Sequence, residues 1–399
     1  MAIPEPHLPP PRPHPGGGTV LPSLLLLGAM FNLTLVVAGL KEFILGELGG
    51  TVADATLFFS VETFAYILCA PLWGLLSDRA GRRRPFIVAG FAASALLYAS
   101  YTFVGSVPVL LALRFVQGAA SVMGWSLVMA SVVDQAEPQR AGRRMGLMGA
   151  ALIFGVGLGA PVGGYLTRWA GPRAPVAAAA ALFAVLALAS LALREGGELR
   201  RGVTLREILG TLGERPRLLL PYAFHFVDRL AVGLFVVVFP LYLDSLGAGD
   251  PAMRGRYLAY FLLPFALLQY FTGRMSERTG PTAPLLVGSI LYGAALATVG
   301  VADLLTLRPI MVVLGLFAAV MFPPAILLTA RLADPRSRGS AMGGFNLAGS
   351  LGFTLGPLLG AWAHAARGFA FAFLAAGLLE IGVAVVAAFF LRPGRRAGG

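Results

Sequence analysis

The sequence predicts an all-α integral membrane protein, with twelve transmembrane helices in two pseudo-symmetric six-helix bundles. Hydrophobic residues make up 57% and charged residues 13% of its 399 positions, and the mean hydropathy is +0.78. One soluble core of this size cannot bury so much apolar surface. Twelve apolar runs are long enough, at about 20 residues each, to cross about 30 Å of hydrocarbon. Motifs also recur about half a chain length apart, which predicts two related bundles.

Residues 1–19 are rich in proline and glycine and lack the charged start of a signal peptide, so we predict a disordered cytoplasmic tail. The first bundle is expected over residues 20–193. Its apolar runs are apolar on all sides, which is typical of membrane helices and not of barrel strands. The predicted spans are 20–40, 55–75, 85–104, 107–133, 145–166 and 175–193.

A basic cytoplasmic linker over residues 194–217 joins the halves. One face of a short surface helix in this linker can be lined by Val203, Leu205, Ile208, Leu209 and Leu212. The second bundle is expected over residues 218–391, followed by a cytoplasmic tail at 392–399. Its predicted spans are 218–243, 257–275, 284–301, 310–330, 342–363 and 369–391.

Most of the arginines fall in segments that face the inside when the N-terminus is inside. Basic residues in short loops stay on the cytoplasmic side, so we predict that both termini are cytoplasmic. The formal net charge of +12 then indicates an anionic membrane surface, and not nucleic acid, as the partner. We expect a prokaryotic cytoplasmic membrane.

Two independent motifs are repeated in the two halves. Residues 74–81 match residues 273–280, and the glycine pattern at 145–164 matches the one at 342–360. Six spans separate the copies, an even number, so both copies keep the same orientation in the membrane. The repeat is therefore parallel, about an axis along the membrane normal.

Residues 74–85, Gly-Leu-Leu-Ser-Asp-Arg-Ala-Gly-Arg-Arg-Arg-Pro, resemble the signature loop of the major facilitator superfamily. Residues 114–118, Arg-Phe-Val-Gln-Gly, resemble the second motif of that family. The resemblance extends over residues 20–391. It implies the two-bundle fold and a small-molecule substrate, and it places spans one, four, seven and ten around a central cavity.

The glycine-rich fifth span is similar to a motif of the family's twelve-span proton-linked drug exporters. It departs from that motif because Ala160 stands where proline is expected and Pro161 follows one place later. Glycines four residues apart share one helix face and let a neighbouring helix approach closely, while prolines permit bending. The packing and hinge candidates in the fifth and eleventh spans are Gly155, Gly159, Pro161, Gly352, Gly356 and Pro357.

Asp78 lies just beyond the C-terminal end of the second span, where the helix dipole disfavours a negative charge. We expect an arginine or the N-terminus of another helix to hold it, as a latch that breaks when the halves rock. The alternative is that Asp78 and the arginines at 82–84 only enforce topology. The latch candidates in the two copies are Gly74, Asp78, Arg79, Gly81, Arg82, Glu277 and Arg278.

Charged residues within spans are costly and are therefore functional candidates. Glu62 in the second span and Arg114 in the fourth lie at depths that allow them to meet. A carboxylate that is paired in one conformation and unpaired in another can carry a proton. The alternative is a static ion pair that holds the first bundle together.

The seventh span carries His225, Asp228 and Arg229 near its middle. His225 shares a helix face with the other two, whereas Asp228 and Arg229 point about 100° apart and are not expected to pair. We predict that this cluster handles substrate or protons, or else forms a structural network. Asn32 in the first span is a weaker candidate, because a lone amide commonly bonds a neighbouring helix.

Three other charged residues lie in or beside the spans. Glu380 is in the middle of the twelfth span, which the resemblance places in the outer scaffold and for which we have no functional interpretation. Lys41 and Glu42 are expected to reach the outer membrane interface.

Enzyme chemistry is not indicated. The sequence contains no phosphate-binding loop and no Gly-x-Ser-x-Gly motif, and its four histidines show no metal-ligand spacing. We therefore expect no catalytic residues, no cofactor and no metal. The expected partners are a small-molecule substrate, protons and membrane lipids, and we expect a monomer.

These observations favour a secondary transporter that works by alternating access and exports a small apolar or amphiphilic solute in exchange for protons. One alternative is an uncoupled facilitator, or a transporter of a lipid-like or sugar solute. A second alternative is a membrane receptor or sensor that keeps the architecture without transporting.

Overall fold

The protein is all-helical over the residues that the structure, a computed structural model, describes: 18–134, 138–195, 203–334 and 337–391. Those residues contain helices and no strands, which confirms the predicted class. The predicted tails lie, apart from residues 18 and 19, outside the described residues.

Each predicted span of the first half coincides with a helix. Helix α2 begins with a capping box between Thr51 and Asp54 and ends at Gly81, whose φ of +67° suits glycine. Helix α1 continues into a 3-10 turn, η1 (Val37–Gly39), and a π-helical segment, η2 (Glu42–Glu47). The six helices are α1 (Val20–Leu35), α2 (Val52–Ala80), α3 (Arg84–Tyr101), α4 (Val107–Asp134), α5 (Pro138–Ala170) and α6 (Ala174–Ser190).

The second half follows the same order after the linker helix α7 (Leu205–Glu214) and the 3-10 turn η3 (Pro216–Leu218). Its last two predicted spans lie in one long element that is broken at Gly368, where φ is +81°. The helices are α8 (Leu219–Ser245), α9 (Pro251–Thr279), α10 (Thr282–Thr298) with η4 (Val299–Val301), α11 (Leu304–Leu332) and α12 (Arg338–Phe390).

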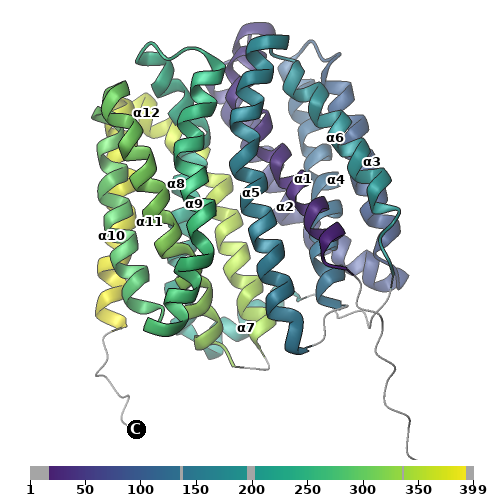
Figure 1. Cartoon of the computed structure of the whole chain (residues 1–399), viewed down its shortest axis with the longest axis vertical. Helices are drawn as coiled ribbons and strands as arrows, with labels where there is room; N and C mark the ends of the chain where they lie inside the picture. Colours follow the sequence, from purple (N-terminus) through teal and green to yellow (C-terminus); the bar gives the residue numbers. More distant parts are fainter. Residues whose placement is uncertain (1–17, 135–137, 196–202, 335–336, 392–399) are drawn as a thin grey trace, which may run out of the picture.

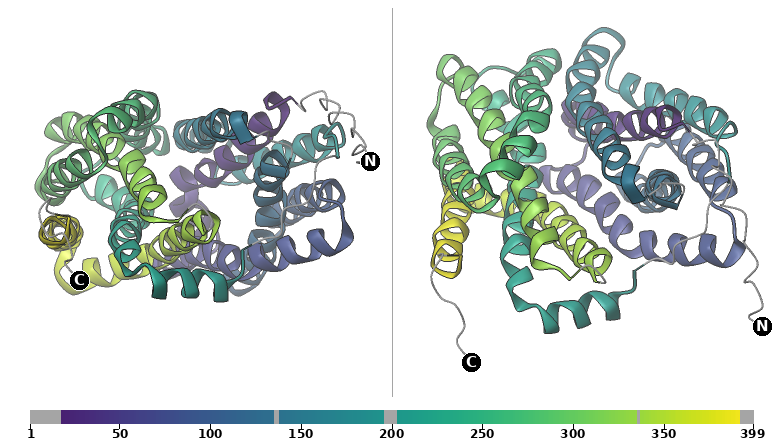
Figure 2. Two further views of the ribbon diagram at one scale, coloured as in Figure 1. Left: turned by 90° about the horizontal axis from the view of Figure 1, so that it is seen from below. Right: turned by 60° about the horizontal axis from the view of Figure 1, so that its bottom comes forward.

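The long helices run roughly in one direction, and α7 lies across one end of the molecule, at the bottom of Figure 1. Helix α12 ends at that same end. In the view from below, α7 lies along one edge of the molecule, near the boundary between the two halves (Figure 2). Both termini are predicted to be cytoplasmic, and α12 ends at the same end as α7. The α7 end is therefore the predicted cytoplasmic end.

The described helices have the composition of membrane spans. Seven are long and apolar enough to cross a membrane, namely α2, α4, α5, α8, α10 with η4, α11 and α12, and α1 and α6 are shorter apolar helices. Large apolar side chains are exposed around the outside, including Leu96, Leu188 and Leu378. Water does not tolerate an apolar surface of this extent, but hydrocarbon does.

The buried apolar side chains form two clusters. One draws on the helices of the first half, and the other draws mainly on α8 to α12 together with a few side chains of the first half. Two pairs of helices from different halves meet at a seam: α5 packs against α9, and α2 packs against α12. At this seam the rings of Phe59 and Phe353 lie 5.0 Å apart, and the Thr354 hydroxyl donates to the Thr63 hydroxyl at 3.0 Å.

The glycines predicted for close packing lie against helices of their own half. A Cβ atom on Gly155 or Gly159 would come within 2.3 Å of a backbone oxygen of α1, and one on Gly352 or Gly356 would come as close to α8. Pro161 lies inside α5, and Pro357 inside α12 contacts the glycine at position 233 of α8. These glycines therefore allow backbone contact between helices, and their role as hinges stays a prediction.

Gly159→Ala is expected to lower the free energy of unfolding by about 1–3 kcal/mol, because its methyl group would overlap the Phe31 carbonyl oxygen, 2.1 Å away. Gly149→Ala is the matched control on the same helix, since nothing lies within 4 Å of a Cβ atom there. Both substitutions raise helix propensity equally. The thermal unfolding midpoints of the two variants in detergent measure the difference, and equal midpoints would contradict the close contact.

The predicted linker helix is present as α7, with a capping box between Thr204 and Glu207. Its apolar side chains do not all share one environment. Ile208 faces Gly343 at the start of α12, whereas Leu205 and Leu209 are each 59% exposed. Helix α7 therefore contacts the second half through Ile208 and leaves the two leucines beside it exposed.

Candidate functional site

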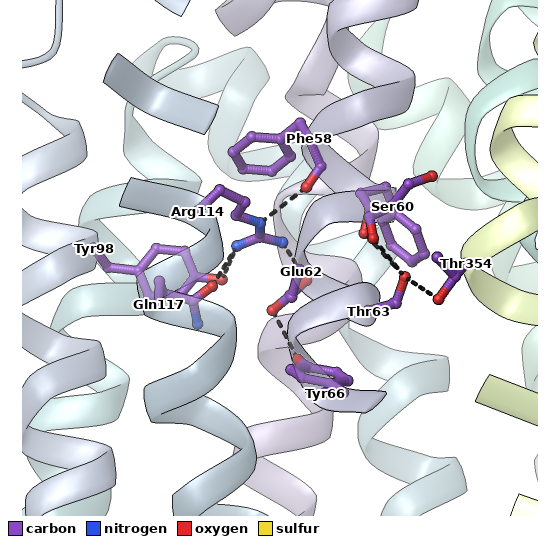
Figure 3. Close-up of polar contacts among 10 residues, drawn as sticks. Phe58, Ser60, Glu62, Thr63, Tyr66, Tyr98, Arg114, Gln117 and Thr354 are labelled. Carbon is purple, nitrogen blue, oxygen red and sulfur yellow. Dashed lines mark hydrogen bonds and ion pairs between the residues drawn. The ribbon is translucent and has the colours of Figure 1, made fainter. Parts of the chain in front are cut away.

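Arg114 is the centre of a polar network inside the first half. It lies on α4 and is 0% exposed. Its guanidinium forms an ion pair with Glu62 of α2, and its Nε donates to the Phe58 carbonyl oxygen at 3.2 Å (Figure 3). One terminal nitrogen donates to the Tyr98 hydroxyl at 2.7 Å and to Gln117 Oε1 at 2.9 Å. Three helices, α2, α3 and α4, thus supply partners to one cation.

Glu62 is also fully bonded. Its second oxygen accepts a hydrogen bond of 2.7 Å from the Tyr66 hydroxyl. Close packing of α2 on α4 makes this contact possible, because a Cβ atom on Gly118 would lie 2.9 Å from the Glu62 carbonyl oxygen. The structure therefore brings Glu62 and Arg114 together, as their depths predicted. Proton transfer here would require the ion pair to separate, since both groups are bonded in this conformation.

Asn32 lies on α1 and is buried beside the same network, next to Tyr98. Its Oδ1 atom has no hydrogen-bond partner among the described residues. An amide oxygen left unbonded inside a bundle is available to a donor on a substrate or on a water molecule.

In the second half, Asp228 and Arg229 pair with each other, contrary to the prediction. Arg229 Nε lies 2.8 Å and a terminal nitrogen 2.7 Å from Asp228 Oδ2. The two side chains leave the helix about 100° apart, but the long arginine side chain folds back over the adjacent carboxylate. Its guanidinium also lies 4.9 Å from the centre of the Phe322 ring, which holds it there.

His225 is close to Asp228 but not firmly bonded to it. Its Nδ1 atom lies 4.0 Å from Asp228 Oδ2 and has no hydrogen-bond partner in the described part of the chain. The imidazole stacks on Phe345 of α12, with ring centres 4.0 Å apart. The histidine is therefore oriented by packing, and its nitrogen is free to accept or donate.

Glu380 lies beside His225 and Asp228, which the sequence did not predict. It lines a small cavity of about 10 Å³, and the other residues of the lining include His225, Asp228 and Ser289. Glu380 is 0% exposed although Leu378 and Leu379 beside it are exposed, so this helix lies at the outside and Glu380 faces inward. The signal that was available is the high cost of a carboxylate in mid-span, which requires a polar environment.

The two polar networks occupy different helices. The Arg114 network uses α2, α3 and α4, and the Asp228 group uses α8, α10, α11 and α12. No hydrogen bond or ion pair joins the two networks within the described ranges. The fold thus holds one charged group in each half.

Asp78 is held by an arginine, as expected, but by one that was not among the candidates. A terminal nitrogen of Arg83 lies 3.0 Å from Asp78 Oδ1, and the same guanidinium bonds Ser77 and forms an ion pair with Asp134 of α4. Arg83 is the buried member of the arginine run. The acidic residue Asp134 at the end of α4 was the signal in the sequence that could have indicated a role for Arg83.

The other latch candidates are at the surface. Arg82 lies 3.5 Å from Glu195, Arg79 is exposed, and nothing lies within 4 Å of a Cβ atom on Gly74. In the second copy, Glu277 and Arg278 are exposed and form no ion pair with any described residue. The two copies of the repeated loop therefore differ in their contacts.

At the opposite end from α7, three ion pairs connect the two halves. Lys41 pairs with Asp244 and Glu42 pairs with Arg254, so both side chains bond across the halves, and their position at the membrane interface stays a prediction. The third pair is Arg168 with Asp250, at 3.1 Å. Lys41 and Glu42 belong to the irregular helix around η2, and π-helical turns are frequent at functional sites.

Comparisons with known proteins agree on one family. The family model described as Major Facilitator Superfamily matches residues 23–247 and 222–398. The chain is 24% identical over 344 residues to the multi-drug resistance efflux pump PmrA homolog of Lactococcus lactis subsp. lactis, with 84% of each chain covered. It is 28% identical over 345 residues to the chloramphenicol resistance protein of Streptomyces lividans, with 84% of this chain and 86% of that protein covered.

The fold is similar to solved structures as well. A mutant of the nucleoside transporter NupG superposes with a TM-score of 0.73 and 15% sequence identity, with 93% of this chain and 98% of that chain covered. At this identity the similarity concerns the fold alone.

Proposed function

Because the chain belongs to the Major Facilitator Superfamily, it is an integral membrane transporter, and we propose that it exports a small apolar or amphiphilic solute in exchange for protons. Relatives named as a multi-drug efflux pump and a chloramphenicol resistance protein support the class of solute. The mostly apolar helices around each charged group also suit such a solute, since few polar groups would need to be satisfied.

The observation that carries alternating access is the uneven distribution of contacts between the halves. Three ion pairs join the halves at the end opposite α7. Near α7, by contrast, the pairs between described residues do not join the two bundles, since Arg83 pairs with Asp134 in the first and Arg215 of the linker pairs with Asp334 in the second. This arrangement suits a conformation that is closed at the first end and ready to open at the α7 end.

The orientation follows from the basic loops. With the arginine-rich loops and α7 in the cytoplasm, the closed end faces outward and the α7 end receives the solute from inside. Breaking the three ion pairs would then accompany release to the outside. We propose that Asn32, His225 and Arg229 contact the solute along this path.

Protons are the proposed counter-substrate because each half buries a carboxylate in mid-membrane. Glu62 is paired with Arg114, and Asp228 is paired with Arg229. A rocking motion that separates either pair would leave a carboxylate without its cation, and protonation would then be favoured. Uncoupled transport would leave these carboxylates with structural roles only.

A pH gradient is expected to drive accumulation of radiolabelled chloramphenicol in proteoliposomes that contain the protein and are acidic inside. Glu62→Gln and Asp228→Asn are each expected to reduce the gradient-dependent part to the level of protein-free vesicles, because neither can release a proton. Glu214→Gln, an exposed change on α7, is the matched control. A protonophore should abolish the accumulation by the unchanged protein.

If uptake by the unchanged protein does not depend on the pH gradient, proton coupling is rejected and a facilitator is favoured. Binding of chloramphenicol without any translocation would favour a receptor. Tetracycline as a second probe separates the choice of solute from the mechanism, since coupling to protons should be visible with whichever compound is carried.

A further inference from the structure

Glu380 is a buried carboxylate for which the proposed mechanism has no role so far. It lies on the second segment of α12 and is 0% exposed. Neither of its carboxylate oxygens has a hydrogen-bond partner among the described residues. Helix α10 packs directly on it, because a Cβ atom on Gly293 would lie 3.3 Å from Glu380 Cβ. No other carboxylate in the described part of the chain has both oxygens buried and unbonded.

The groups around Glu380 come from three other helices. Helix α8 contributes His225 and Asp228 to the shared cavity, with Arg229 bonded to Asp228. Helix α10 contributes Ser289, and Tyr292 is its buried titratable neighbour. Helix α11 contributes apolar side chains, among them Met321 and Phe322.

Among the described residues no cation is paired with Glu380, and the hydroxyl of the neighbouring Ser289 donates to Met321 Sδ. Arg229, the cation beside Asp228 in this group, is bonded to Asp228 and lies against the Phe322 ring. Burial of an ionised carboxylate without a partner is strongly unfavourable. Asp228 adds repulsion of like charge across the cavity. A proton on Glu380 removes both penalties.

A metal ion is a poorer occupant than a proton. The described residues contain no group of three or more histidine, cysteine, aspartate or glutamate side chains that could hold one. The cavity, at about 10 Å³, is also close to the smallest that accepts one water molecule. One water there could link Glu380 to the unbonded His225 Nδ1 atom.

We propose that Glu380 is a proton-binding site of the second half, and that it exchanges its proton through the cavity it shares with His225 and Asp228. In this conformation the carboxylate has taken a proton from a hydronium ion and is a neutral carboxylic acid. When the halves rock and the cavity opens to water, the acid returns the proton to water and becomes a carboxylate. Its use in transport rests on the proton coupling proposed above.

Labelling of the unchanged protein with a hydrophobic carbodiimide tests the bound proton without any substitution. Carbodiimides add to protonated carboxylic acids and rearrange to a stable N-acylurea. Mass spectrometry of reconstituted protein is expected to locate the adduct on Glu380 at neutral pH and to show its loss at alkaline pH. Glu62, which is paired with Arg114, is the internal comparison and should be labelled less.

Glu380→Gln tests the role in transport, because glutamine imitates the protonated side chain in size and neutrality. Accumulation of chloramphenicol driven by a pH gradient should be lost, whereas exchange of labelled for unlabelled chloramphenicol without a gradient should continue. Glu214→Gln should leave both unchanged.

The proposal is overturned if the carbodiimide does not label Glu380 in the unchanged protein, or if Glu380→Gln retains gradient-driven accumulation. If the unchanged protein itself ignores the gradient, the proposed function fails, and the labelling still decides whether Glu380 binds a proton. The two failures can therefore be told apart.

Discussion

Arg114→Ala is expected to lower the free energy of unfolding by about 3–5 kcal/mol. The substitution leaves the carboxylate of Glu62 buried without its cation, and it also removes the donors to Phe58 and Tyr98. The thermal unfolding midpoint in detergent measures the loss of stability. The yield of monodisperse protein is a second measure of it. The same substitution at Arg215 is the control, because its ion pair with Asp334 is about half exposed and is expected to contribute about 0–1 kcal/mol.

Equal losses in Arg114→Ala and Arg215→Ala would contradict the buried network. The prediction requires that the penalty come from an uncompensated charge and not from the loss of one side chain as such. Glu62→Gln also leaves a buried charge without its partner, but its loss should be smaller than that of Arg114→Ala because the guanidinium keeps its bonds to Phe58, Tyr98 and Gln117.

The double variant Arg114→Met with Glu62→Gln separates the two interpretations of this pair. Neutral replacement of both members of a buried ion pair is often close to neutral for stability. If the pair is only structural, the double variant should fold and transport with normal pH dependence. If Glu62 carries protons, the double variant should fold and lose the response to a pH gradient.

Glu42→Ala is expected to shift the conformational equilibrium away from the outward-closed form by about 3 kcal/mol or more. Arg254 is fully buried, and two of its nitrogen atoms already lack partners among the described residues, so it depends on Glu42 for its charge balance. A shift of about 3 kcal/mol changes the ratio of two conformations roughly a hundredfold. The open population should therefore become large enough to measure.

Spin labels at Ala170 and Ser245 would report this shift, because both residues are exposed near the closed end and belong to different halves. The labels require Cys69→Ser, since Cys69 is the only cysteine. Distances between the labels should gain a longer component in Glu42→Ala. Glu47→Ala is the matched control: its ion pair with Arg173, at 2.5 Å, lies at the same end but within the first half. Identical distance distributions in the two variants would show that the Glu42 pair does not hold the halves together.

The three ion pairs at this end have different exposures and should contribute unequally. Arg254 is completely buried, whereas Lys41 and Arg168 are partly exposed and are screened by water. Removal of the Glu42–Arg254 pair should therefore have the largest effect on opening, and removal of Arg168–Asp250 the smallest. This order gives alternating access a quantitative test at individual residues.

The spans and their order could be predicted because they depend on local properties. An apolar run of about 20 residues has to be helical in lipid, where each backbone polar group needs a partner within its own segment. Helix ends were equally local, as the capping boxes of Thr51 and Thr204 show. The meeting of Glu62 with Arg114 also followed from depth alone.

Partners that depend on side-chain conformation, on a loop or on an irregular turn could not be predicted in this way. Asp228 pairs with Arg229 because a long side chain can fold back, although their Cβ directions diverge. Asp78 pairs with Arg83 because the loop after α2 turns at Gly81 and brings α3 alongside. Lys41 and Glu42 bind the second half because α1 ends in an irregular turn that directs them across the seam.

Hydrophobicity, segment length and repetition act along the chain, so the order of residues is enough to specify a doubled set of membrane helices with charges at mid-depth. Which helices face each other, and hence the position of Glu380 in a cavity with His225 and Asp228, is known only from the folded protein. Lipid favours every orientation of an apolar helix almost equally. The rotation and tilt that select polar partners therefore come from packing between helices.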